Sequence, residues 1–159
     1  MTERQIVVLV FHGLLLVFLG MVVGVPFHEA ITADWGPEAE RAWRVAHTSL
    51  LGGGALYLGV AAVAHCLVLG PRAAALTVWS LVAVVYAFVF GFVVGPAIGA
   101  RGLEPVGPAL HVAVFVVFAG GLVAAFLAFG IVLWGAFVAM RRPGPVAPGP
   151  TARRRAQRP

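Results

Sequence analysis

A chain of 159 residues has room for one domain, and 61% of its residues are hydrophobic while only 11% are charged. This balance is the reverse of that in a water-soluble domain, so it argues against a soluble globular enzyme and predicts an integral membrane protein. The single cysteine, Cys66, excludes an intramolecular disulfide.

Long uncharged stretches separate the charged residues and predict four membrane spans. Each stretch is long enough to cross a hydrocarbon core of roughly 30 Å, which takes about 20 apolar residues. Helices are expected because a segment in lipid must satisfy its own backbone hydrogen bonds, and these segments lack the alternation of barrel strands. The predicted fold class is all-α, an integral membrane four-helix bundle formed by residues 1–142. The expected spans are about 5–27, 42–69, 73–99 and 108–140.

The first apolar stretch has a competing interpretation as a cleaved signal peptide. Its apolar run is too long for one, and it ends at Gly24-Val25-Pro26-Phe27 without a small-residue cleavage pattern. We therefore expect it to remain in the protein as a helix.

The loop after the first span predicts the start of the second helix. Asp34 is a candidate capping residue, Pro37 suits the first turn, and Glu38 places an acid near the helix N-terminus. Tryptophans are expected at the membrane boundaries, with Trp35 and Trp43 on the outer side and Trp134 on the inner side.

Closely spaced glycines predict tight helix packing. Small residues let helix backbones approach in lipid, where no hydrophobic force drives association. The glycines concerned are Gly20-x-x-x-Gly24, Gly91-x-x-x-Gly95 and the run Gly52-Gly53-Gly54.

Arginines predict the orientation of the chain. The +5 net charge comes mostly from arginines after the last span, in a Pro/Gly-rich tail (residues 143–159) that we expect to be disordered. By the positive-inside rule both termini are predicted to be cytoplasmic. A basic tail of this kind is conceivable as a nucleic-acid arm, but contact with anionic lipid is favoured, and no nucleic-acid partner is expected.

Histidines are the candidate chemical residues within the predicted spans. Carboxylates and lysines are missing there, which argues against a proton relay or an ion-coupled carrier. A single histidine in a span can also simply hydrogen-bond across a helix interface. His12 lies in the first span, His47 and His65 lie in the second, His111 lies in the fourth, and His28 lies at the outer mouth.

Among these histidines, His47 is favoured as a ligand. It follows Trp43 by one helical turn, lies a few residues inside the outer boundary, and precedes three glycines that leave space for a large flat group. An imidazole in apolar surroundings is neutral, which is the state that ligates iron. Because no Cys/His set with zinc spacing accompanies it, haem is favoured over zinc.

Several short motifs give the chain a resemblance to a known family. Over most of the four-span region it is similar to styrene oxide isomerase, a small four-helix bacterial membrane enzyme, and the Trp-x-x-Ala-His element is the most specific part. The matching motifs are Phe11-His12-Gly13-Leu14-Leu15, Trp43-Arg44-Val45-Ala46-His47 with Gly53 beyond it, and Arg101-Gly102-Leu103 followed by Gly107-Pro108.

This resemblance implies a haem b-dependent isomerase that acts in styrene degradation. It implies a homotrimer with ferric haem b held between neighbouring subunits, His47 as the metal ligand and Trp43 in the cofactor-binding element. The ferric iron would act as a Lewis acid that promotes rearrangement of an aryl epoxide, such as styrene oxide, to an aldehyde (a Meinwald rearrangement) in a dry apolar cavity. Phe88, Phe90 and Phe92 are candidate walls of that cavity.

Two positions depart from the family pattern. An Asn and a Tyr that help hold the epoxide in the family fall on Gly53 and Phe92, which makes these two the pocket candidates. Loss of one hydrogen bond to a charged transition state costs about 2–4 kcal/mol, so the activity is expected to be slower, directed at another epoxide, or absent.

Two other interpretations stay open at this point. One is a non-catalytic or electron-transfer b-type haem protein, in which a second histidine such as His111 or His28 ligates the iron from the other face. The other is a helical membrane module whose histidines only pack. The absorption spectrum of the purified protein distinguishes all three.

Overall fold

The computed structural model describes residues 1–142 and consists of four long helices. Each of the four is long and apolar enough to cross a membrane, so the predicted all-α four-helix architecture is confirmed. The basic tail predicted for residues 143–159 lies outside the described residues. The helices are α1 (Glu3–Thr32), α2 (Pro37–Val63), α3 (Pro71–Ala97) and α4 (Ala109–Met140), and a short 3-10 turn, η1 (Ala64–Cys66), follows α2.

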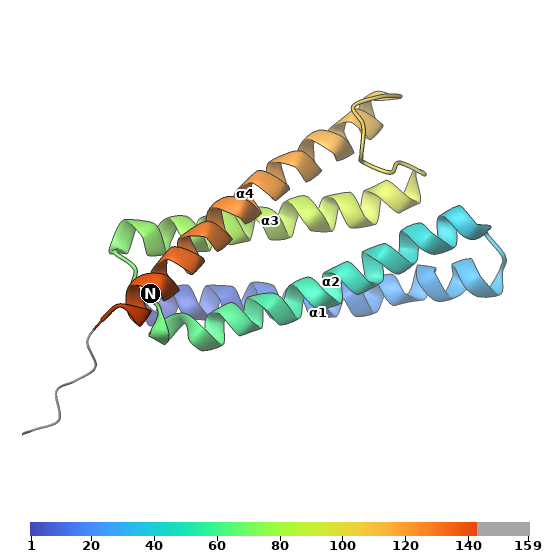
Figure 1. The fold of residues 1–159 in the computed structure, drawn as a ribbon. Helices are drawn as coiled ribbons and strands as arrows, with labels where there is room; N and C mark the ends of the chain where they lie inside the picture. The colour runs from blue at the N-terminus through green and yellow to red at the C-terminus, as the bar shows by residue number, and fades with distance from the viewer. Residues whose placement is uncertain (143–159) are drawn as a thin grey trace, which may run out of the picture.

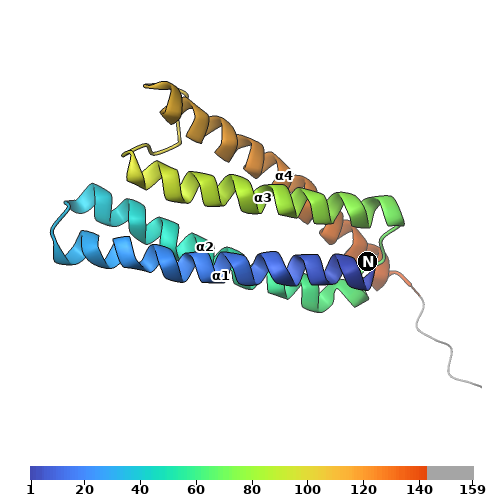
Figure 2. The same ribbon diagram turned by 180° about the vertical axis from the view of Figure 1, so that it is seen from behind.

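The helices are arranged as two antiparallel hairpins. Helix α1 pairs with α2, α3 pairs with α4, and α3 joins the two hairpins by packing against both α1 and α2. Helix α4 crosses α3 and diverges from the other helices toward the end of the bundle that holds the α1–α2 and α3–α4 connections (Figures 1 and 2). We name this end the outer end, after the predicted orientation. The chain's N-terminus, the α2–α3 connection and the end of α4 lie together at the opposite end, which we name the inner end.

Helix α2 has different bounds from the predicted second span. It begins at Pro37, five residues before the predicted start, and the chain leaves the helical conformation after Cys66. The predicted capping role of Asp34 is wrong, because Gly36 is the N-cap and no side chain caps it. Asp34 instead occupies the turn with a φ of 50°, a left-handed conformation that Asp tolerates better than most residues. The proline prediction is confirmed, since Pro37 lies in the first turn.

Glycines hold the helices of each hairpin close together, as the sequence predicted. A Cβ atom on Gly54 of α2 would lie 2.6 Å from a Val17 methyl group and 2.7 Å from the Gly13 carbonyl oxygen on α1. On α3, a Cβ atom on Gly91 would lie 2.6 Å from the Phe118 ring of α4. Larger residues at these two positions would therefore push the paired helices apart.

The bundle core links α2 to α3. Leu50 and Leu81 are almost completely buried, and the hydroxyl of buried Tyr57 donates a 2.6 Å hydrogen bond to the Leu81 carbonyl oxygen. Trp43, which was expected at the membrane boundary, is buried in this core with 8% of its surface exposed. Trp134, by contrast, is 63% exposed near the end of α4.

Candidate functional site

The imidazole of His47 on α2 is half-buried and contacts α1. Its Nδ1 atom lies 2.8 Å from the backbone carbonyl oxygen of Gly20. A carbonyl oxygen only accepts hydrogen bonds, so Nδ1 carries the proton and donates it. In the neutral ring the lone pair then resides on Nε2, the nitrogen that is left for a ligand.

Two further residues of α1 fix the orientation of this ring. A Cβ atom on Gly24 would lie 3.2 Å from both Nδ1 and Cε1 of His47, so the absence of a side chain there makes room for the imidazole. The Phe27 ring lies 5.8 Å from the His47 ring, centroid to centroid, with the two planes tilted by 31°. The ring is therefore held by a hydrogen bond and an aromatic contact, both to residues of α1.

A charged group lies one helical turn from His47 toward the outer end of the bundle. The guanidinium carbon of Arg44 is 5.9 Å from the centroid of the Phe27 ring, and Arg44 forms an ion pair with Glu40 on the same helix. The site thus has an apolar interior and a charged margin, as expected for a group at the membrane boundary.

The glycines after His47 have different surroundings. Gly52 is exposed, and a Cβ atom there would meet nothing within 4 Å. On half-buried Gly53 a Cβ atom would lie 3.6 Å from Leu16 of α1, which is an ordinary contact. Gly54 alone of the three is required for close helix packing. Positions 52 and 53 therefore leave free space on α2 beyond His47.

Phe92, the second pocket candidate, packs between α3 and α4. Its ring lies 4.9 Å from that of Phe118 and 5.7 Å from that of Phe88, each in an edge-on arrangement. His47 and Gly53 both face α1, so the structure places the two pocket candidates in different helix interfaces of the chain. Trp43 supports the site indirectly, because its burial in the core fixes the turn of α2 that precedes His47.

The other histidines lie elsewhere in the bundle. His12 is buried and its Nδ1 atom bonds the Val8 carbonyl oxygen at 2.8 Å, which is a packing contact within α1. His65 contacts Cys66 at the inner end, His111 lies on the first turn of α4, and His28 is exposed on α1. Within residues 1–142 there is no group of three or more His, Cys, Asp or Glu residues that could hold a metal ion. A haem needs only one or two protein ligands, so a single anchored imidazole fits it better than it fits zinc.

The sequence did not identify the residues that hold His47. Gly20 and Gly24 were predicted to pack helices, and the structure adds that the Gly20 carbonyl accepts the histidine proton and that Gly24 accommodates the ring. A Gly-x-x-x-Gly pair in one span and a histidine in the next is the only signal of this arrangement in the sequence, and it does not specify which faces meet.

Comparison with known proteins identifies a family. The family model described as styrene oxide isomerase matches residues 5–137, a range that includes nearly all of the four helices. No curated protein and no solved structure matches the chain.

Proposed function

Because the chain belongs to the styrene oxide isomerase family, we propose that it isomerises an aryl epoxide such as styrene oxide to an aldehyde with the help of haem b. The observation that carries the haem assignment is the hydrogen bond from His47 to Gly20. It holds the ring in one orientation and leaves the lone pair of Nε2 available to a metal. Bound there, ferric haem would supply a Lewis acid that polarises the epoxide C–O bond.

His47 has two tasks in this proposal. Its Nε2 atom would hold the iron, while its Nδ1–H group stays bonded to the Gly20 carbonyl, which keeps the ring in one tautomer and one orientation. A hydrogen bond of this kind also makes the ring a stronger electron donor to the metal.

The apolar side chains around the site exclude water. Phe27 lies against the imidazole, and Leu16 and Leu51 approach the same stretch of the α1–α2 interface. The proposed reaction moves one hydrogen between the two epoxide carbons while the C–O bond opens, so it consumes neither water nor a redox equivalent. Water in the site would divert the opened epoxide to a diol, and dry surroundings suppress that side reaction.

A homotrimer with haem between subunits is part of the proposal. It rests on the family resemblance, and His47 is only half-buried by its own chain, so a neighbouring subunit has room to cover the rest of the ring. Helix α4 also presents large exposed apolar residues, which contact either lipid or a neighbouring subunit, and these include Val123, Phe126 and Leu133.

We further propose a cytoplasmic-membrane location with both termini in the cytoplasm. The inner end of the bundle carries most of the described arginines, while most of the described carboxylates lie at the outer end. This asymmetry follows the positive-inside rule. The arginines at the inner end are Arg4, Arg72, Arg141 and Arg142.

The proposal is tested by loading the purified protein with haem, adding styrene oxide and measuring phenylacetaldehyde by gas chromatography. We expect a Soret band and product formation above that of free haem in the same detergent. A colourless protein from haem-supplied cells would overturn the haem assignment. A low-spin spectrum typical of two histidine ligands, without product, would favour the electron-transfer alternative.

A further inference from the structure

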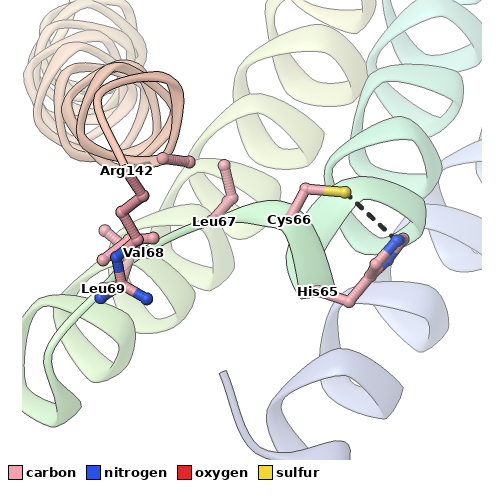
Figure 3. A pocket seen from close by; sticks show the side chains of 7 residues that line it. His65, Cys66, Leu67, Val68, Leu69 and Arg142 are labelled. Carbon is pink, nitrogen blue, oxygen red and sulfur yellow. Dashed lines mark hydrogen bonds between the residues drawn. The ribbon is translucent and has the colours of Figure 1, made fainter. Parts of the chain in front are cut away.

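A cavity of about 450 Å³ lies at the inner end of the bundle, far along α2 from His47. It is formed where α2 ends in the η1 turn, the chain runs on toward α3, and α4 reaches its last turn (Figure 3). The residues that line it are His65, Cys66, Leu67, Val68, Leu69, Ala139 and Arg142.

The walls of this cavity are fixed by contacts between the α2–α3 connection and α4. The Val68 amide donates a 3.2 Å hydrogen bond to the Gly135 carbonyl oxygen. A Cβ atom on Gly135 would lie 2.6 Å from Leu69, so the connection rests directly on the α4 backbone. The α2–α3 wall of the cavity is therefore held in place by direct contact with α4.

Most of the accessible lining is polar, and a smaller part of it is apolar. Leu67, Val68 and Leu69 supply hydrocarbon, and the guanidinium of Arg142 lies beside the last two of these residues (Figure 3). His65 and Cys66 lie on the α2 side, with 3.2 Å between the His65 Nε2 atom and the Cys66 sulfur.

The charge of the lining has one sign. None of the described lining residues is acidic, and Arg142 provides a permanent positive charge. Nearby, α4 presents Trp134 and Phe137 on its surface, and Arg141 lies over the Phe137 ring at 4.3 Å. Aromatic rings followed by arginines are the pattern of a membrane boundary, where lipid headgroups meet protein.

We propose that this cavity binds an anionic phospholipid, with its phosphate on Arg142 and the upper part of its acyl chains against the leucine and valine side chains. The charge of Arg142 matches the phosphate, and its fork of N–H donors suits phosphate oxygens. The charged and polar part of the lining therefore suits the headgroup, and the smaller apolar part suits the start of the adjoining hydrocarbon.

Cys66 provides a built-in reporter for this proposal. It is the chain's single cysteine, its side chain is exposed, and it lines the cavity. The rate of alkylation by an uncharged maleimide is measured on the full chain in detergent while phosphatidylglycerol or phosphatidylcholine is added. We expect phosphatidylglycerol to slow the alkylation of Cys66 at concentrations at which phosphatidylcholine does not.

Variants of two arginines separate the site from general surface charge. Arg142→Gln is expected to raise the phosphatidylglycerol concentration needed for protection about fivefold, the value of one arginine near an anionic surface. Arg141→Gln removes the same charge one residue away, from a side chain that stacks on Phe137 and does not line the cavity. This matched variant is expected to retain protection, and Arg142→Lys is expected to restore part of it.

Three results would overturn the proposal. Equal protection by phosphatidylcholine would show that the headgroup charge is not recognised, and equal protection by inorganic phosphate would identify a free anion as the occupant. Equal weakening in Arg141→Gln and Arg142→Gln would show attraction to the whole surface. The assay needs no haem, so its outcome is independent of the proposed isomerase activity.

Discussion

The Nδ1 atom of His47 on α2 donates its proton to the carbonyl oxygen of Gly20 on α1, over a distance of 2.8 Å. A helical carbonyl at this position normally accepts from the amide four residues further along its own helix, and it has a second lone pair for a side-chain donor. This bond joins the two helices of the first hairpin and fixes which imidazole nitrogen is available for iron.

The first prediction concerns the proposed iron ligand. His47→Ala is expected to abolish haem retention, because the variant lacks the nitrogen that holds the iron. The chain should stay folded and inserted, since the hairpin is also held by its glycine contacts. The Soret absorbance per mole of purified protein measures the effect, and His12→Ala is the control because His12 bonds within α1. Full Soret absorbance in His47→Ala would show that another residue ligates the haem.

The second prediction concerns the space beside the imidazole. A Cβ atom on Gly24 would lie 3.2 Å from the His47 ring, so Gly24→Ala forces the ring to move and strains its bond to Gly20. We expect haem affinity to fall about tenfold or more, the usual cost of disturbing a group that orients a metal ligand. Haem titration followed by the Soret band measures this affinity.

Gly52→Ala is the matched control for that variant. It makes the same chemical change on the facing helix, at a position where a Cβ atom meets nothing within 4 Å. Its haem affinity should equal that of the unmodified chain. If the two alanine variants bind haem equally well, the packing of Gly24 against His47 plays no part in haem binding.

The sequence predicts the helices of this protein better than the contacts between them. Four spans and the packing role of Gly54 and Gly91 could be predicted because apolar length and small residues are local properties. The pairing of His47 with Gly20 could not, because it depends on how α1 is rotated against α2 over a separation of 27 residues.

The buried position of Trp43 was missed for the same reason. The amphipathic indole side chain of Trp43 suits a membrane boundary, but the rotation of α2 places it in the core. The end of α2 was missed because residues 67–69 are as apolar as the helix itself, whereas in the structure they lie outside the helix and contact Gly135 of α4. Composition alone carries no information on either contact.

The third prediction concerns the link between the two hairpins. Tyr57→Phe removes the hydroxyl that donates to the Leu81 carbonyl and keeps the aromatic ring. We expect the free energy of unfolding to fall by about 1 kcal/mol, the usual net value of one such hydrogen bond. Unfolding in mixed detergent micelles measures the change. Tyr86→Phe is the control, since Tyr86 is 58% exposed, and an equal loss in both variants would show that the Tyr57 bond has no special role.

The fourth prediction concerns Gly53, where the resemblance to the family implies an asparagine. A Cβ atom on Gly53 makes an ordinary contact at 3.6 Å, so α2 has room to begin a side chain there. If an amide at this position holds the epoxide oxygen, Gly53→Asn should raise turnover of styrene oxide about tenfold or more, because a donor to developing negative charge is worth several kcal/mol. Phenylacetaldehyde formation at saturating haem measures the rate.

The neighbouring glycine shows whether such a gain is specific to position 53. Gly54→Asn introduces the same amide one residue on, but a Cβ atom there would lie 2.6 Å from Val17 and 2.7 Å from the Gly13 carbonyl oxygen. That variant is expected to separate α1 from α2 and to lose stability in detergent. If Gly53→Asn binds haem normally but turns over styrene oxide no faster than the unmodified chain, this position does not contact the epoxide oxygen. The substrate then contacts a different part of the protein surface around the iron.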